Sequence, residues 1–312
     1  MYSASADLIR GAAALREKYN LCGHTHVLET RGQALMAKQF FSSQSAVKYL
    51  KECGFLDKKL RGTSLAHTVW LTEEEYKIVA EEKATCVHNP ISNLRLGSGI
   101  MPVYQVSSNL QVNVAMGIDG ASSSDGQDML EALKLGAILS TVSRPDYREW
   151  LTAREVALQY ASKNGYAGVG MEGKGGEIKV GMEADLTLWD LTSLALLPRT
   201  DPLSLLVLGS RTQAPGAGAT LHSSWVRGYR VVADGSPTRL DLIRFREMLC
   251  NAQKTYRDSS ITIPSKDCPH TAAAEREYRF AMGLEQDEKT KPFPPDLGTF
   301  PTDRVPYNST IK

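Results

Sequence analysis

The 312-residue chain lacks an excess of either charge. Its 36 lysines and arginines almost balance 35 aspartates and glutamates, which leaves a formal net charge of +1 at pH 7. A strong field of one sign is typical of proteins that bind nucleic acid, anionic membranes or polyanionic substrates. The balance speaks against these partners and favours a small neutral substrate.

The chain also lacks the cysteine patterns of disulfide-rich and zinc-knot proteins. Its five cysteines are odd in number, scattered and never spaced as Cys-x-x-Cys, which speaks against both classes. No stretch reaches the roughly 18 uninterrupted apolar residues of a membrane span, and the N-terminus has no apolar core of secretory type. We therefore expect a soluble, cytoplasmic protein.

What the chain does contain is an alternation of helix and strand patterns. Apolar residues at helical spacing predict helices, and short apolar runs between them predict strands. Thr72 followed by Glu75 forms a capping box at the start of one helix. The predicted helices lie within residues 6–20, 45–54, 72–82 and 127–144, and the predicted strands within 21–30, 63–71, 84–90 and 112–120.

Polar residues that can act in catalysis or metal binding lie at the C-terminal ends of these apolar runs. They are His26, His67, His88 and Asp119, separated by 41, 21 and 31 residues. Such spacings suit the roughly 30-residue repeat of a βα unit. A (β/α)8 barrel builds its active site from the ends of consecutive parallel strands. Four parallel strands with a site at one rim are therefore predicted.

The stretch "HTHVLET" adds two features to the first of these strand ends. His24 and His26 alternate, so in a strand both side chains point to one face, and Glu29 follows three residues after His26. The two imidazoles together are suited to a metal or to a pocket.

The pattern changes after about residue 165. Short alternating runs in a glycine-rich stretch predict an antiparallel sheet, with Gly228 at a hairpin turn. We divide the chain into a partial barrel (1–165), a small β-sandwich portion (166–238), a C-terminal helix (239–257) and an extended, weakly ordered tail (258–312).

Five motifs together resemble the metal-dependent amidohydrolase superfamily, in the branch of cytosine, guanine and S-adenosylhomocysteine deaminases and triazine hydrolases. Their order and spacing carry the resemblance, which covers about residues 1–240. It implies an α/β fold: the C-terminal half of a (β/α)8 TIM-like barrel, strands five to eight, with a small β-sandwich domain. The motifs are "HTHVLET", "LAHTVWLTEEEYKIVAE", "VHNPISNLRLGSGIMPV", "GIDGASSSDGQDMLEALKL" and "GGEIKVGMEADLTLWDL".

The resemblance assigns roles to individual residues. It implies that His26 ligates a divalent metal, zinc or alternatively iron, and that Glu29 shuttles a proton from the metal-bound water to a ring nitrogen of the substrate. By the same resemblance, His67 would orient that water or join the ligand set. Asp119 would bind the metal and take a proton from the nucleophile. A divalent metal lowers the pKa of its bound water from 15.7 to about 7, which makes hydroxide available at neutral pH.

The resemblance also implies a pocket and a reaction. His88, Ser92 and Asn93 would line the substrate pocket, and Ser123 would hold a ligand carboxylate or a loop carbonyl behind the metal. The implied reaction is hydrolytic deamination of an amino-substituted N-heterocycle, which is a purine, a pyrimidine or a triazine-like ring. Nucleophilic attack on such a carbon requires a metal, a base and an acid.

One part of the family's site is missing from this sequence. The superfamily takes two further metal ligands from a His-x-His pair on its first barrel strand, and no such pair precedes "HTHVLET". We expect an in-frame His-x-His to be encoded within about 200 residues upstream, as a barrel of roughly 250 residues requires.

Other readings of the missing pair stay open. His24 and His26 have the spacing of that pair, although the order of the motifs places them on strand five and His24 in the barrel interior. The chain can also be a truncated, non-catalytic half-barrel that acts as a binding or regulatory subunit. Finally, it can be a half that forms homo-oligomers or pairs with an N-terminal half, because a half-barrel leaves a bare sheet edge.

Overall fold

The computed structural model describes residues 4–209 and 218–258. Contacts divide the chain into two compact units. The first comprises the described residues up to Ala184 and those within 190–219, and the second comprises Asp185–Trp189 and the described residues from Thr220 onward. The predicted weakly ordered tail lies, apart from its first residue, outside the described residues.

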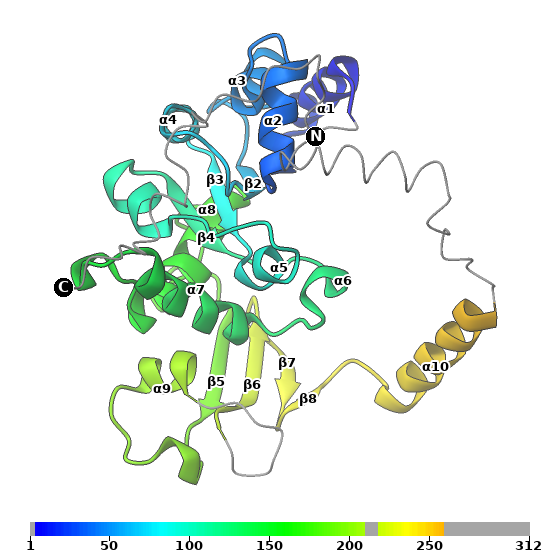
Figure 1. The fold of residues 1–312 in the computed structure, drawn as a ribbon. Helices are drawn as coiled ribbons and strands as arrows, with labels where there is room; N and C mark the ends of the chain where they lie inside the picture. Colours follow the sequence, from blue (N-terminus) through cyan, green and yellow to red (C-terminus); the bar gives the residue numbers. More distant parts are fainter. Residues whose placement is uncertain (1–3, 210–217, 259–312) are drawn as a thin grey trace. The chain divides into compact units, whose positions relative to one another are not determined.

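The first unit is built from alternating helices and strands (Figure 1). Its elements are α1 (Ala6–Tyr19), β1 (Gly23–Val27), α2 (Arg31–Phe40), α3 (Ala46–Glu52), β2 (Thr63–His67), α4 (Glu73–Glu81), β3 (Thr85–His88), α5 (Pro90–Arg95), the π-helix η1 (Gln105–Asn109), β4 (Asn113–Met116), α6 (Ala121–Ser124), α7 (Met129–Ser143), the 3-10 helix η2 (Tyr147–Glu149), the π-helix η3 (Glu155–Lys163), α8 (Asn164–Gly168), the 3-10 helix η4 (Leu194–Leu196) and α9 (Pro202–Leu208).

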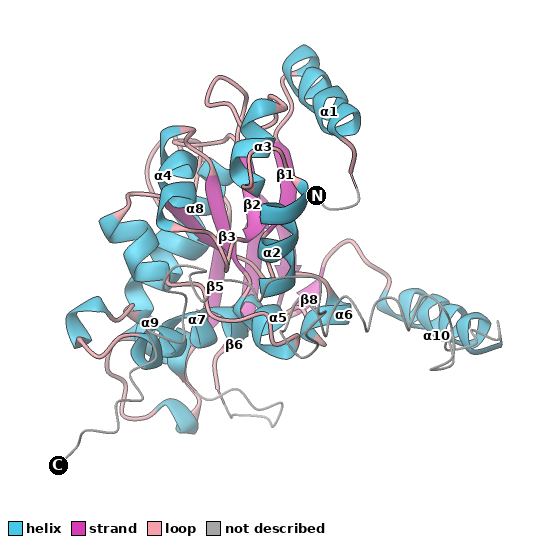
Figure 2. Cartoon of the chain, turned by 45° about the horizontal axis from the view of Figure 1, so that its top comes forward, coloured by secondary structure: helices cyan, strands magenta, loops and turns pink. Residues whose placement is uncertain are grey.

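The strands of this unit form one parallel sheet in the order β1-β2-β3-β4. Figure 2 shows β1, β2 and β3 side by side with helices around them. The register runs from His26 opposite Ala66, through Val87, to Ala115. The four predicted strands are therefore confirmed, and because they are parallel their C-terminal ends meet at one rim.

Buried apolar side chains hold the helices against the sheet. Val27, Leu65 and Val114 of the strands and Val79 of α4 are fully buried. The predicted capping box of α4 is present, with both the Thr72 and the Glu75 side chains engaged. These contacts fix the strand ends that carry the polar residues.

Helix α2 is an element that the apolar spacing does not predict. A capping box also starts it, because the Thr30 side chain accepts from the Gln33 N–H and the Gln33 side chain accepts from the Thr30 N–H. Thr-x-x-Gln was therefore the signal in the sequence that marks this helix.

A buried arginine attaches α1 to the start of β2. The Arg16 guanidinium is 4% exposed and donates to the carbonyls of Phe55, Arg61 and Gly62 and to the Thr63 hydroxyl. All four acceptors are neutral, and burial lowers the pKa of Arg16 despite the opposing effect of Cys22. The helix is held by charge-assisted hydrogen bonds rather than by an apolar contact alone.

Replacing Arg16 with methionine should lower the free energy of unfolding by about 3 kcal/mol, because it leaves several buried acceptors without a donor. Arg10→Met on the same helix is the matched control, since among the described residues Arg10 forms an exposed ion pair with Asp7 and no other. It should cost less than about 0.5 kcal/mol. Urea unfolding followed by circular dichroism measures both. Equal effects of the two substitutions would contradict the anchoring role.

The second unit contains a small sheet in the order β5-β6-β7-β8 followed by a helix. β6 pairs antiparallel with β7 and β7 with β8, and Gly228 forms the predicted hairpin turn at φ +81°. The antiparallel pairing is confirmed, and the β-sandwich stays a prediction. The elements are β5 (Leu186–Asp190), β6 (Thr220–Val226), β7 (Tyr229–Ala233), β8 (Ser236–Pro237) and α10 (Leu242–Asp258).

No helix in the described ranges combines the length and the apolar character that crossing a membrane requires.

Candidate metal centre

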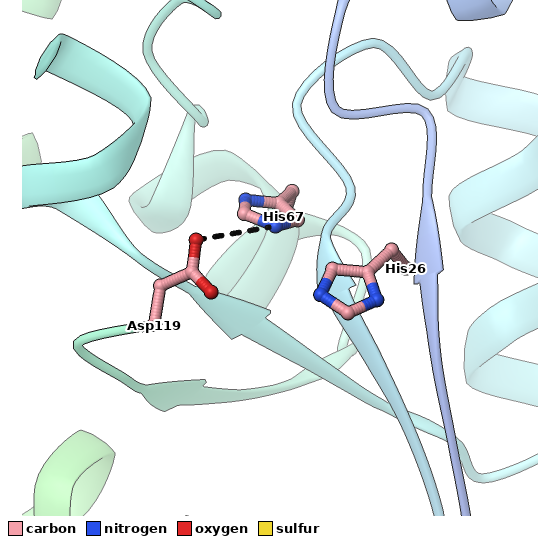
Figure 3. A group of neighbouring side chains, drawn as sticks. All are labelled: His26, His67 and Asp119. Carbon is pink, nitrogen blue, oxygen red and sulfur yellow. Dashed lines mark ion pairs between the residues drawn. The ribbon is translucent and has the colours of Figure 1, made fainter. Parts of the chain in front are cut away.

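Three polar side chains from different strand ends converge at the rim of the parallel sheet. His26 on β1, His67 at the end of β2 and Asp119 in the loop after β4 each offer one ligand atom, and these atoms lie within 4.8 Å of one another. Figure 3 shows the three side chains gathered, with the Asp119 carboxylate facing the His67 ring. The His26 and His67 rings stack with centroids 5.3 Å apart.

His67 occupies the centre of the group and is 1% exposed. Its Nε2 lies 3.8 Å from Asp119 Oδ2 and 3.9 Å from Glu29 Oε2. Its Nδ1 lies 2.9 Å from Asn93 Oδ1, within hydrogen-bond distance. One ring nitrogen is therefore engaged with an amide and the other faces the two carboxylates.

Two serine hydroxyls hold the Asp119 carboxylate. Ser92 and Ser123 both donate to Asp119 Oδ2, at 2.6 and 2.9 Å. Burial acts to raise the pKa of Asp119, but these hydroxyls and the Gly120 N–H outweigh it, so that the pKa is lowered. The group is an ionised carboxylate at neutral pH, as a metal ligand must be.

Glu29 lies beside this group and is held by a residue that the sequence reasoning missed. The Ser98 hydroxyl donates to Glu29 Oε1 at 3.2 Å. The Trp70 indole in turn donates to the Ser98 carbonyl at 2.7 Å. Because Ser98 is 69 residues away from Glu29 along the chain, no local pattern signals this contact.

The backbone at the rim is strained. His67, Thr68 and Asp119 have φ of +69°, +48° and +63°, and Leu28 has +47°. Left-handed conformations of residues other than glycine cost energy and persist where the surroundings hold them. Sharp turns of this kind aim the side chains of strand-end residues at a common point.

Hydrogen bonds between neighbouring strands hold these turns. The Thr68 N–H donates to the Val27 carbonyl at 2.9 Å and the Trp70 N–H donates to the Leu28 carbonyl at 3.0 Å. The pairing of β1 with β2 thus continues past the ends of both strands.

His24 lies near the group but outside it. It shares the exposed face of β1 with His26, as the alternation predicts, and its Nδ1 lies 2.8 Å from Ser64 Oγ. Burial lowers the pKa of His24, and the charges of His26 and His67 act in the same direction. The described cluster of ligand atoms does not include it.

His88 is also separate from the group, although it too ends a strand. It is 1% exposed and lines a small cavity with Met101, Gly136 and Ser140. Its Nδ1 has no hydrogen-bond partner among the described residues. The structure thus brings Ser92, Asn93 and Ser123 to the candidate centre but not His88, whose substrate contact stays a prediction.

The buried His88 should make the protein sensitive to acid. Burial lowers the pKa of His88 to about 3, with His67 acting in the same direction, whereas an unfolded histidine titrates near 6.5. Below about pH 6.5 the unfolded chain takes up a proton that the folded chain does not, so stability is lost as the pH falls.

Replacing His88 with glutamine should remove this loss. Between pH 7 and pH 5 the free energy of unfolding of the unsubstituted protein should fall by about 2 kcal/mol more than that of the variant. Urea unfolding at both pH values measures the difference. If the free energy of unfolding fell equally with pH in both proteins, His88 would take up its proton in the folded state as readily as in the unfolded state.

The donor set suits a divalent metal such as zinc. Two imidazoles and one carboxylate are ordinary ligands of catalytic zinc, which keeps a further position open. The 3.8 Å between His67 Nε2 and Asp119 Oδ2 is close to the roughly 3.3 Å that separates ligands in a tetrahedral site with bonds of 2.0–2.1 Å. Small side-chain movements would bring the ligand atoms to coordination distance.

Arg95 carries an exposed ion pair. Its Nε lies 2.6 Å from Asp125 Oδ2.

Comparison with known families now identifies the class of protein. Residues 1–216 match the amidohydrolase family. This is more than half of the chain, and the chain therefore belongs to the amidohydrolase family. The resemblance carried by the five motifs is confirmed.

Curated relatives of the chain include deaminases. The chain is 33% identical over 234 residues to a 5-methylthioadenosine/S-adenosylhomocysteine deaminase of Pyrococcus furiosus, covering 75% of this chain and 52% of the relative. It is 34% identical over 207 residues to a 5'-deoxyadenosine deaminase of Methanosphaera stadtmanae, covering 66% and 46%. The chain thus spans about half the length of the curated relatives it matches.

Solved structures agree on the fold. An adenosine deaminase of Xanthomonas campestris with bound zinc superimposes with a TM-score of 0.72 and 25% identity, covering 82% of this chain and 56% of that one. An atrazine chlorohydrolase of Arthrobacter aurescens complexed with zinc gives a TM-score of 0.70 at 22% identity, covering 79% and 52%. These neighbours imply an α/β fold of the TIM-barrel type.

Proposed function

We propose that this chain forms the strand-five to strand-eight part of a zinc-dependent deaminase that acts on an amino-substituted N-heterocycle. The observation that carries the proposal is the convergence of His26, His67 and Asp119 beside Glu29. The names of the relatives favour a 6-aminopurine nucleoside over a pyrimidine or a triazine. Iron is the alternative metal.

The proposal gives each side chain a task. His26 and Asp119 hold the metal, with His67 as a third ligand or as the group that orients water. When bound, the metal would supply hydroxide near neutral pH. Glu29, 3.9 Å from His67 through its Oε2, carries a proton to the ring nitrogen of the substrate, and the ionised Asp119 accepts a proton from the attacking water.

The proposal extends to the architecture. Residues 1–165 form strands five to eight of the barrel, residues 166–238 belong to a small β-sandwich, and residues 239–257 form the C-terminal helix. Within the described sheet β1 is an edge strand. That edge suits pairing with a segment that carries the family's His-x-His, or with a second copy of the chain.

Metal content and ammonia release test the proposal together. The protein is purified without chelator, its zinc and iron are measured, and the zinc-loaded protein is assayed with adenosine, 5'-deoxyadenosine, 5-methylthioadenosine and S-adenosylhomocysteine. Cytosine and an aminotriazine serve as substrates of the competing classes. We expect bound zinc and release of ammonia from a nucleoside. A folded protein that binds no metal and releases no ammonia, both alone and together with the segment that carries the family's His-x-His, would instead support the non-catalytic binding subunit.

A further inference from the structure

We infer that Asn93 is a positioning residue that fixes the tautomer of His67, so that the proton sits on Nδ1 and the lone pair of Nε2 faces the candidate metal centre. The consequence for a metal rests on the proposed function, whereas the tautomer itself does not. No motif of the sequence assigns this role, since the family resemblance implies a substrate contact for Asn93.

With the Asn93 amide in this orientation, the distances around the ring indicate which nitrogen carries the proton. His67 Nδ1 lies 2.9 Å from Asn93 Oδ1, which is a full hydrogen bond. His67 Nε2 lies 3.8 and 3.9 Å from the carboxylates of Asp119 and Glu29, which is too far for one. A single proton on the neutral ring is therefore better placed on Nδ1.

The placement of Asn93 allows it to impose this choice. Its side chain is 1% exposed, and so is that of His67, so water does not compete for the bond. Asn93 lies on α5, where its N–H donates to the Asn89 carbonyl and its carbonyl accepts from the Ser98 N–H. The backbone that carries the amide is thus fixed on both sides.

The same segment also holds the other groups of the centre. Ser92 precedes Asn93 and donates to Asp119, and Ser98 follows the helix and donates to Glu29. Residues 92–98 therefore contact side chains from three different strand ends, and Asn93 is the residue that bonds to the His67 imidazole. If Asn93 donated a hydrogen bond to His67 Nδ1, the ring proton would sit on Nε2, which could then not ligate a metal. If Asn93 accepts the bond, the proton sits on Nδ1 and Nε2 is free.

The rival arrangement is an Asn93 amide turned over. The amide nitrogen Nδ2 has no hydrogen-bond partner among the described residues, so nothing on the far side of the amide opposes a turn. In that arrangement Nδ2 would donate to His67 Nδ1, and Nε2 would carry the proton. Asparagine can form both arrangements, whereas aspartate can only accept.

The experiment is long-range ¹H–¹⁵N NMR of the metal-free full chain with labelled histidine, at a pH where the ring is neutral. His67→Gln assigns the signal. We expect the Nδ1–H tautomer in the unsubstituted protein and in Asn93→Asp, and loss of that preference in Asn93→Ala. Asn113→Ala is the matched control, because Asn113 lies at the opposite end of the sheet and donates to Thr85; it should leave His67 unchanged.

Two outcomes would overturn the inference. One is an Nε2–H tautomer in the unsubstituted protein that converts to Nδ1–H in Asn93→Asp, which is the signature of the turned amide. The other is a His67 spectrum that Asn93→Ala does not change. Asn93→Asp keeps the test valid if the alanine variant fails to fold.

Zinc affinity adds a second readout. Asn93→Ala should weaken Zn²⁺ binding by about 10- to 100-fold, the usual effect of removing a group that orients a ligand, and Asn93→Asp should restore it. Isothermal titration with zinc alone measures this. An Nδ1–H tautomer in a protein that neither binds zinc nor deaminates, even together with the segment that carries the family's His-x-His, would leave the positioning role intact and refute the proposed function.

Discussion

Replacing Glu29 with glutamine should lower the rate of ammonia release by about 10² to 10⁴-fold, the range that a positioned acid or base contributes. Glutamine keeps the size of the side chain and can still accept from Ser98, which donates to Glu29 at 3.2 Å. It cannot carry a proton from water to a ring nitrogen. The zinc stoichiometry should not change, because the described group of ligand atoms does not include Glu29.

Steady-state assays with the best nucleoside substrate, together with metal analysis of the same samples, measure this effect. Glu131→Gln is the control for charge removal, since Glu131 is an exposed residue in the first turn of α7 and is not part of the described group of ligand atoms. A loss of zinc in Glu29→Gln would move Glu29 into the ligand set, and an unchanged rate would exclude it from proton transfer.

Replacing His26 with alanine should weaken Zn²⁺ binding by about 100-fold or more. Structural zinc sites contribute of the order of 10 kcal/mol over three or four ligands, so that one ligand accounts for about 3 kcal/mol. His24→Ala is a matched control on the same face of the same strand. Its ring is paired with Ser64, and its loss should leave affinity almost unchanged.

Competition with a chromogenic chelator measures both affinities. Equal losses in His24→Ala and His26→Ala would support the alternative in which these two histidines are themselves the paired metal ligands. No effect of His26→Ala would remove it from the candidate centre.

The sequence predicts the rim of the sheet because local patterns determine it. Apolar runs of strand length, each ending in His26, His67 or Asp119, repeat at the spacing of βα units, and parallel strands bring such ends together. The structure places these three side chains in one group. The order and the chemistry of these residues could be predicted without knowing the path of the loops.

The contacts that hold the group depend on the path of the loops, which the sequence does not reveal. Ser98 reaches Glu29 only because the chain after α5 turns back toward β1. In the sequence, Trp70 is most simply a hydrophobic packing residue. Its donation to the Ser98 carbonyl follows from the same turn of the chain. Such contacts join residues without any fixed separation along the chain.

His88 marks a limit of reasoning from strand ends. It ends β3 as His67 ends β2, but it lines a cavity with residues of α7. Strands of a parallel sheet are buried on both faces, so their apolar sequences do not show which face the last residue joins. The sequence also gives no sign of the left-handed turn at His67, because the usual signal of such a turn is glycine or asparagine.

The hydrogen bonds that continue past the ends of β1 and β2 make the site a single cooperative unit. Separation of the two strands would displace His26, Glu29 and His67 in one step, because the Thr68 and Trp70 amides bond to Val27 and Leu28. Slow deuterium uptake at those two amides would therefore report an assembled site in a sample that holds neither metal nor substrate. Their protection factors give a measure of readiness for binding that is independent of turnover.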